Sequence, residues 1–221
     1  MANIAIIIPA LNESRSIFPV VSEVKPLATW VIVVNDGSTD NTQELAQKAG
    51  ALVINHKTNR GQGAALETGD RKAKELGADI IVHFDADGQF LATDIRKVCQ
   101  PIIDNQADIV FGSRFLSSSN ELPWLKKNII MPIAKIVSRL FWDIRLSDPQ
   151  SGFRAFNKKV ADKLVIENDG MAHCSEIIIF AHKNKYRIKE VPITVIYHRF
   201  GQNLGGGLRI IKDLIYKNII Q

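Results

Sequence analysis

The stretch DIIVHFDADGQF at residues 79–90 places two acids, Asp85 and Asp87, directly after a short apolar run. The run is continuous and rich in Ile and Val, which is typical of a strand covered on both faces of a sheet. Asp and Gly are unfavourable inside strands, so we expect the strand to end where the acids begin. Residues i and i+2 of an extended backbone point to the same side, which lets both carboxylates share one cation.

The same strand pattern recurs through the first 115 residues. Further apolar runs lie at residues 3–8, 30–34, 51–55 and 108–112. The segments around them have helical patterns, at residues 13–25, 39–48, 63–76 and 93–104, with N-cap candidates at 38–40 and 93–94. Alternating strands and helices predict an α/β fold with a mainly parallel sheet flanked by helices.

Each of these strands leads into a polar, charged or Gly-rich segment. The segments are PALNE (9–13), NDGSTD (35–40), NHKTNRGQGAAL (55–66), DADGQ (85–89) and SRF (113–115). In open α/β sheets, ligands bind beyond the carboxyl ends of the strands. One such segment is compatible with an ordinary turn, but five at the same edge predict a binding rim.

The composition is that of a soluble globular domain. The chain has 221 residues, of which 46% are hydrophobic and 23% charged, and suits one domain spanning residues 1–221. Cys99 and Cys174 have no metal or disulfide spacing, which indicates a reduced, cytoplasmic setting. The N-terminal MANIAIIIPALNE reads as a core strand instead of a signal peptide. No apolar run reaches the roughly 18 residues of a membrane span.

The net charge of +5 is unevenly distributed. Residues 1–120 carry 11 basic and 14 acidic side chains, whereas residues 121–221 carry 17 basic and 9 acidic ones. This asymmetry predicts that the second half meets an anionic partner, although a solvated basic surface has the same pattern. The basic half lacks an RNA-binding or zinc-finger signature, so we expect no nucleic-acid partner.

The Asp-x-Asp pattern is open to several interpretations. Carboxylate oxygens suit Mg²⁺ or Mn²⁺, which would complete its shell with water and a substrate phosphate, such as that of a nucleotide diphosphate. A capped β-turn has the same pattern. Haloacid dehalogenase-type phosphatases usually carry the pattern after the first strand, with Thr or Val next to it. Here the pattern comes after the fourth strand, and Gly88 is the next residue. An EF-hand loop requires Glu where this chain has Arg96.

Two other rim segments are compatible with nucleotide binding. Asp36 could accept hydrogen bonds from a base or ribose, or could form a plain Asp-Gly turn before a helix N-terminus that favours anions. The segment 59–66 contains G-x-G-x-x-L, which is neither a dinucleotide-binding fingerprint nor a P-loop.

The order of the motifs is more specific than any one of them. IPALNE, NDGSTD, NRGQGAA and DADGQ are followed by GSRF (112–115), SGFR (151–154) and EVP (190–192). This order resembles the family 2 inverting glycosyltransferases with the GT-A fold, over roughly residues 4–205. DPQSGFR (148–154) and HRFGQN (198–203) resemble the dolichyl- and undecaprenyl-phosphate sugar transferases, such as dolichyl-phosphate mannosyltransferase. The absence of QxxRW argues against processive polysaccharide synthases.

The resemblance implies roles for residues at matching positions. The nucleotide-sugar pocket would contain Pro9, Ala10, Asn12, Glu13, Asp36, Gly63, Asp85, Ala86 and Asp87. The metal would be held by Asp85, Asp87 and Gln89. Catalysis would depend on Asp87, Arg114, Asp148 and Arg199, and acceptor or donor phosphate would meet Arg114, Arg154 and Arg199. Asn35 stands where the family often has a first acid, and Glu176 is interpreted as structural or as a residue that supports the site residues.

The implied reaction is metal-dependent, inverting transfer of a hexose from a GDP- or UDP-sugar to a polyprenyl phosphate. A phosphate with a second pKa of about 6 is largely ionised at neutral pH and needs no strong general base. A saccharide hydroxyl acceptor would need one, and Asp148 is then the candidate. A non-catalytic nucleotide-sugar-binding module is a further alternative.

The second half is expected to bind the acceptor, as residues 1–115 are expected to bind the nucleotide sugar. We predict a loop at 147–154, a helix at 174–184 and one or two strands at 187–198. Segments 123–142 and 207–220 are amphipathic and either pack on the sheet or lie on the membrane surface. The polyprenyl acceptor favours a peripheral location on the cytoplasmic face, with or without a separate membrane subunit.

Overall fold

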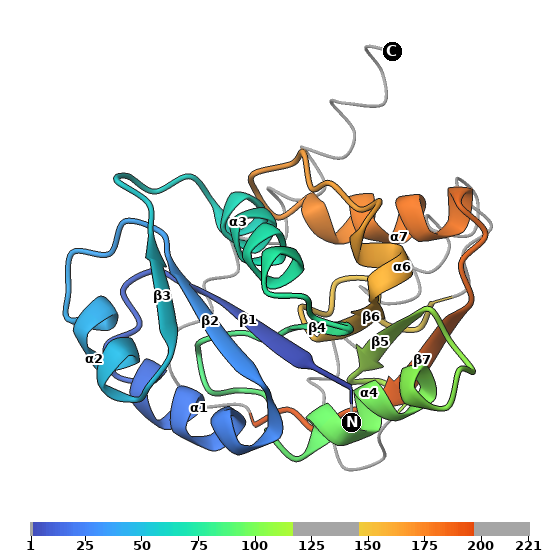
Figure 1. The fold of residues 1–221 in the computed structure, drawn as a ribbon, viewed down its shortest axis with the longest axis horizontal. Coiled ribbons are helices and arrows are strands. Elements are labelled where there is room, and N and C mark those ends of the chain that lie inside the picture. Colours follow the sequence, from blue (N-terminus) through green and yellow to red (C-terminus); the bar gives the residue numbers. More distant parts are fainter. Residues whose placement is uncertain (1, 117–145, 197–221) are drawn as a thin grey trace, which may run out of the picture.

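The structure, a computed structural model, describes residues 2–116 and 146–196 and confirms the α/β fold (Figure 1). The strands are β1 (Ile4–Ala10), β2 (Trp30–Asn35), β3 (Leu52–Asn55), β4 (Ile80–His83), β5 (Ile109–Ser113), β6 (Arg154–Asn157) and β7 (Ile188–Pro192). The helices are α1 (Ile17–Val24), α2 (Thr42–Lys48), α3 (Gln62–Glu75), α4 (Asp94–Ile103), α6 (Lys158–Ala161) and α7 (His173–Lys183), with a 3-10 turn η1 (Lys25–Leu27). The predicted segments 123–142 and 207–220, and Arg199, lie outside the described residues.

The described strands form one sheet in the order β3-β2-β1-β4-β6-β5-β7. All neighbouring pairs are parallel except those of β6, which is antiparallel to both β4 and β5. The sequence did not predict β6, because Arg154 was assigned to the loop at 147–154 and the three residues that follow are too few to show a strand pattern. Its first residue, Arg154, pairs with His83 and with Phe111 near the carboxyl ends of β4 and β5. The segment that precedes β6 therefore lies at the edge predicted to bind ligands.

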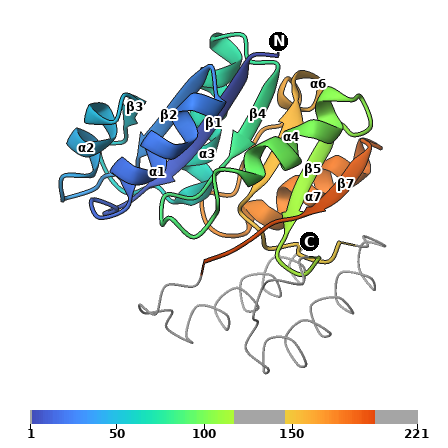
Figure 2. The ribbon, with the colours of Figure 1, turned by 90° about the horizontal axis from the view of Figure 1, so that it is seen from below.

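Helices cover both faces of the sheet. Helices α1, α2 and α4 pack on one face and α3, α6 and α7 on the other, as Figures 1 and 2 show. Successive β1 side chains point to opposite faces, so Ile6 and Ile8 belong to one core and Ala5 and Ile7 to the other. This explains why the strand sequences are continuously apolar instead of alternating. Within the described residues, no helix has the length and hydropathy needed to span a membrane.

Two helices begin later than predicted because their preceding residues bind each other. The Asn12 N–H donates to Ser38 Oγ at 2.9 Å, and the Thr39 N–H donates to Asn12 Oδ1 at 2.8 Å. These bonds join the loops after β1 and β2. Consequently α1 begins at Ile17, and α2 begins at Thr42 with Asn41, and not residues 38–40, at the N-cap position.

Gly69 sets the distance between α3 and the sheet. It is buried on the helix face that packs on β1, and a Cβ built there would overlap the Cγ2 atom of Ile7. The absence of a side chain at this position therefore lets α3 lie directly on the strand that carries the first rim segment.

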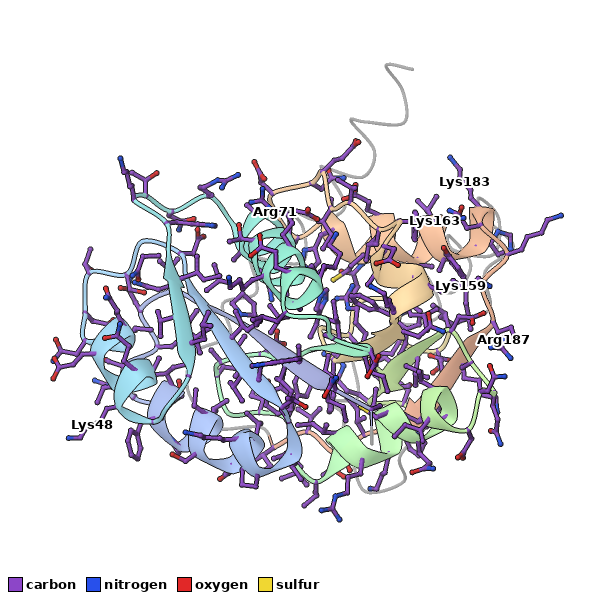
Figure 3. The ribbon with its side chains drawn as sticks, in the orientation of Figure 1. Lys48, Arg71, Lys159, Lys163, Lys183 and Arg187 are labelled. Carbon is purple, nitrogen blue, oxygen red and sulfur yellow. The ribbon has the colours of Figure 1, made fainter. Side chains whose placement is uncertain are left out.

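Replacing Gly69 by Ala should destabilise the protein. At an open helix position the change from Gly to Ala is favourable by about 1 kcal/mol, but here we expect a loss of about 1–3 kcal/mol because the methyl group displaces Ile7. Urea unfolding monitored by circular dichroism measures the free energy. Arg71→Ala, on the exposed side of the same helix (Figure 3), should change it by less than about 0.5 kcal/mol. Unchanged or increased stability of Gly69→Ala would contradict the close packing.

Candidate active site

A cleft of about 380 Å³ lies at the carboxyl ends of β1, β2 and β4, beside the first turn of α3. Seven residues predicted for the nucleotide-sugar pocket line it: Pro9, Ala10, Glu13, Asp36, Asp85, Ala86 and Asp87. Five further lining residues were not predicted: Leu11, Asn59, Gly61, Gln62 and Ala65. Because these strands are parallel, their loops converge from distant parts of the sequence onto one cleft.

Three acids of the cleft are close enough to repel each other. Burial raises the pKa of Asp85 to about 6, the neighbouring Asp87 carboxylate adds to this shift, and the Arg154 guanidinium opposes it. Burial also raises the pKa of Glu13, a hydrogen bond from Ser16 opposes the rise, and the charge of Asp87 contributes to it. Burial is the larger cause of both shifts and the charge of Asp87 adds to each, and a bound cation would favour the ionised forms of these acids.

The donor set fits a hard divalent cation. Asp85 Oδ1 accepts a hydrogen bond from the Gln62 side chain at 3.1 Å, while Asp87 is exposed and accepts from the Gln89 N–H at 3.0 Å. Among the described residues, no three or more His, Cys, Asp or Glu side chains form a complete metal site. Mg²⁺ or Mn²⁺ held by the two acids would complete its shell with water and substrate phosphate. Gln89, the third predicted ligand, is not among the residues that line the cleft.

Gly152 packs directly against the Asp85 carboxylate. A Cβ at this glycine would lie 2.5 Å from Oδ2 and 2.8 Å from Oδ1 of Asp85. The glycine belongs to the segment that leads into β6, so the antiparallel strand brings it to the acids. SGFR was recognised as a motif in the sequence, but the role of its glycine required the three-dimensional contact.

Arg154 lies beneath the acids and not on the surface of the cleft. It is only 1% exposed, and its Nη2 donates to the Ser151 carbonyl at 3.0 Å and to Cys174 Sγ at 3.2 Å. Its positive charge favours the ionised form of Asp85. The predicted contact between Arg154 and a phosphate stays a prediction.

Asp36 forms the wall of the cleft nearest β2. Its Oδ1 accepts from the Arg60 N–H at 2.9 Å and lies 2.7 Å from His56 Nδ1, while Oδ2 accepts from the Gly61 N–H at 2.7 Å. Gly61 has a φ of 104°, a value that favours glycine. Asp36 therefore holds the Gly-rich loop in place. A base or ribose, as predicted, would bind a carboxylate that already accepts hydrogen bonds from this loop.

Two predicted pocket residues lie beside the cleft instead of lining it. Asn12 joins the first two rim loops, as described above, and Gly63 donates its N–H to the Asp169 carbonyl at 2.7 Å. The loop containing Asp169 is held by Glu176, whose oxygens accept from the N–H groups of Glu167 and Asn168 at 2.9 and 3.0 Å. Glu176 thus holds the loop that Gly63 contacts.

Arg114 and Asp148, both predicted catalytic residues, form a bidentate ion pair. The Arg114 Nε and Nη2 donate to the two oxygens of Asp148 at 2.7 Å each, and the Arg114 backbone N–H donates to Asp148 Oδ2 at 3.1 Å. Asp148 is 1% exposed, whereas the Arg114 side chain is 29% exposed. Arg114 does not line the cleft, but its guanidinium is near enough to Asp85 for its charge to favour the ionised carboxylate.

The fold places the protein in a class, the proteins with a GT-A-like fold. Glucosyl-3-phosphoglycerate synthase of Mycobacterium tuberculosis, solved with Mn²⁺, UDP-glucose and phosphoglyceric acid, superposes with a TM-score of 0.71 at 20% identity. The match covers 91% of this chain and 73% of that one. The chain belongs to glycosyl transferase family 2, whose family profile matches residues 5–165, and it is a glycosyltransferase.

Two relatives that match over most of their own length have more specific names than the family. A UDP-N-acetylglucosamine–dolichyl-phosphate N-acetylglucosaminyltransferase of Methanococcus voltae is 36% identical over 97% of this chain and 94% of its own length. Polyprenol monophosphomannose synthase of Mycolicibacterium smegmatis is 27% identical over 96% of this chain and 84% of its own. The resemblance to polyprenyl-phosphate sugar transferases is thus confirmed at the level of the family and its relatives.

A methyl group at Gly152 should weaken metal binding without unfolding the protein. In Gly152→Ala the side chain would displace the Asp85 carboxylate, so we expect the Kd for Mn²⁺ to rise about 10-fold or more. The electron paramagnetic resonance signal of free Mn²⁺ measures this Kd. Gly170→Ala is the matched control, because a Cβ there meets no atom within 4 Å. Equal Mn²⁺ affinity in both variants would argue against a role for Gly152.

Metal binding should also depend on pH through Asp85. Its pKa lies above the ordinary value, so the carboxylate takes up a proton as the pH falls through about 6, and the cation must displace this proton. We expect Mn²⁺ affinity to be constant above about pH 7 and to fall about tenfold per pH unit below about 6. Without metal, the free energy of unfolding has the opposite pH dependence. The stabilisation that protonated Asp85 contributes is lost as the pH rises through about 6. A constant Mn²⁺ affinity down to pH 5 would contradict this assignment.

Proposed function

We propose that this glycosyltransferase moves a hexose from a GDP- or UDP-sugar to a polyprenyl phosphate and depends on Mg²⁺ or Mn²⁺. The observation that carries the proposal is the pair of acids Asp85 and Asp87 in the cleft, with the Arg114 guanidinium near enough for its charge to act on Asp85. A cation on the acids and a fixed positive side chain beside it can bring two anionic substrates together. The names of the Methanococcus and Mycolicibacterium relatives support a dolichyl or other polyprenyl phosphate as the acceptor.

The donor would lie in the cleft with its diphosphate at the acids. When bound, the cation supplies positive charge that stabilises the leaving diphosphate. The Mn²⁺ and UDP-glucose in the superposable mycobacterial enzyme support this arrangement. Asp36 and the loop that it holds would form the nucleoside end, and Glu13 and Gln62 would line the same cleft.

The Arg114–Asp148 pair favours a phosphate acceptor over a saccharide hydroxyl. A hydroxyl nucleophile needs a base, and both oxygens of Asp148, the predicted base, are bound by Arg114. A phosphate nucleophile is already ionised and needs a positive group to offset its charge, which Arg114 provides. Arg114 thus acts as a phosphate ligand, and Asp148 fixes its orientation.

A polyprenyl acceptor also implies contact with a membrane surface. We infer a peripheral location on the cytoplasmic face, with residues 116–221 binding the acceptor and residues 1–115 binding the donor. The excess of 17 basic over 9 acidic side chains in residues 121–221 supports contact with anionic lipid.

Asp87→Asn tests the proposed reaction. The protein is incubated with radiolabelled UDP- and GDP-sugars, Mn²⁺ and a polyprenyl phosphate, and label in the organic phase is counted. We expect metal-dependent transfer by the wild type and a loss of about 100-fold or more in Asp87→Asn, because a metal ligand is removed. Asp162→Asn, an exposed acid on the C-cap of α6, is the control and should keep wild-type activity.

The same assay separates the alternatives. Transfer to a saccharide but never to lipid would refute the polyprenyl acceptor, and normal activity of Asp87→Asn would refute the metal site. Donor binding without turnover under every condition would favour a binding module. Tight, salt-sensitive binding of nucleic acid that is unaffected by Asp87→Asn would favour a nucleic-acid partner.

A further inference from the structure

Glu190, in the EVP segment of β7, uses both carboxylate oxygens on a segment 43 residues away. Its Oε1 and Oε2 accept from the Ser147 N–H at 2.8 and 2.9 Å, and Oε1 also accepts from the Ser147 hydroxyl at 2.8 Å. The Asp148 N–H donates to the same Oε1 at 3.1 Å. Residues 146–150 belong to no helix or strand, so Glu190 supplies acceptors that regular structure would otherwise provide.

The sheet fixes Glu190 relative to the strand that leads to Arg114. Strand β7 pairs in parallel with β5, with Glu190 opposite Phe111 and Pro192 opposite Ser113. The Ser113 and Ser147 hydroxyls are 2.6 Å apart, so the loop is also fastened to the end of β5. Arg114 follows Ser113 directly. Arg114, its partner Asp148 and Glu190 are therefore all connected to the paired strands β5 and β7.

We propose that Glu190 is a positioning residue for Arg114: it holds Ser147 and Asp148 so that Asp148 keeps the Arg114 guanidinium in the orientation described. This inference rests on the phosphate-binding role proposed for Arg114. Glu190 acts through Asp148, and no contact with substrate is required of it.

The charges explain why an acid is suited to this position. The Glu190 carboxylate binds the backbone of Ser147 and Asp148, and Asp148 carries a second carboxylate. Two negative charges on neighbouring groups are unfavourable unless each is surrounded by donors. Asp148 is compensated by the Arg114 guanidinium, and Glu190 by two backbone N–H groups and a hydroxyl. Hydrogen bonds to an ionised acceptor are roughly twice as strong as neutral ones, so a carboxylate holds this irregular segment more firmly than an amide would.

A double-mutant cycle between Glu190→Gln and Arg114→Ala tests the proposal. Glu190→Gln loses the charge and turns one acceptor oxygen into a donor that faces the Ser147 N–H. We expect it to lower kcat for transfer to polyprenyl phosphate by about 10- to 100-fold in the wild-type background. In the Arg114→Ala background we expect a further loss of less than about twofold, because Glu190 then has no guanidinium to position.

The control variant is Lys189→Gln, at the neighbouring position of β7. The Lys189 side chain is exposed and donates to Gln106 at 2.8 Å, away from the 146–150 loop. It should keep wild-type kcat. An equal loss of kcat for Glu190→Gln in both Arg114 backgrounds would show a general structural role and overturn the proposal.

A second measurement does not depend on the proposed function. The Arg114 Nε–Hε resonance, identified by its absence from the spectrum of Arg114→Ala, should be rigid in the wild type, with an order parameter of about 0.8, and fall below about 0.6 in Glu190→Gln. A protein that transfers no sugar but shows this change would refute the function and support the positioning role. An Nε–Hε group that stays equally rigid in Glu190→Gln would overturn the positioning role whatever the activity.

Discussion

A partly buried carboxylate, that of Asp85, is the charge around which the site is arranged. Burial and the adjacent Asp87 act against its ionised form, whereas a Gln62 hydrogen bond and the charges of Arg154 and Arg114 favour it. Removing a charge from water costs several kcal/mol unless polar partners replace the water. The partners here come from α3, β6 and the end of β5, so the position of one carboxylate depends on three separate elements. A divalent cation would complete this compensation.

The loops that line the site reach one edge of the sheet from the parallel strands, and the antiparallel strand β6 brings a further segment to the same edge. Parallel neighbours deliver the loops after β1, β2, β4 and β5 to one edge. Strand β6 runs the opposite way, so the segment before it, containing Gly152, reaches the same edge. The support of the site beneath Asp85 and beside Arg114 therefore comes from the second half of the chain.

Patterns of neighbouring residues predicted most of the fold, and contacts between distant residues account for what was missed. Buried parallel strands are continuously apolar, which is why β1, β2, β4 and β5 and the acids after β4 could be located from the sequence. Strand β6 has four residues, too few to show a period, and it begins with an arginine whose burial depends on Ser151, Gly152 and Cys174. Gly152 and Glu190 lie in motifs that the sequence revealed, but Asp85 and Ser147, their partners, are known only from the folded chain.

The insertion of β6 between β4 and β5 also bears on how the protein is made. The halves proposed to bind the donor and the acceptor are divided along the sequence near residue 115, yet the sheet interleaves them, because residues 154–157 separate two strands of the first half. A nascent chain that has reached residue 116 holds β4 and β5 without the strand that joins them, and each exposes an unpaired edge. The sheet of the first half is therefore incomplete without residues 154–157, and the cleft takes the shape described here only once these residues have paired with β4 and β5.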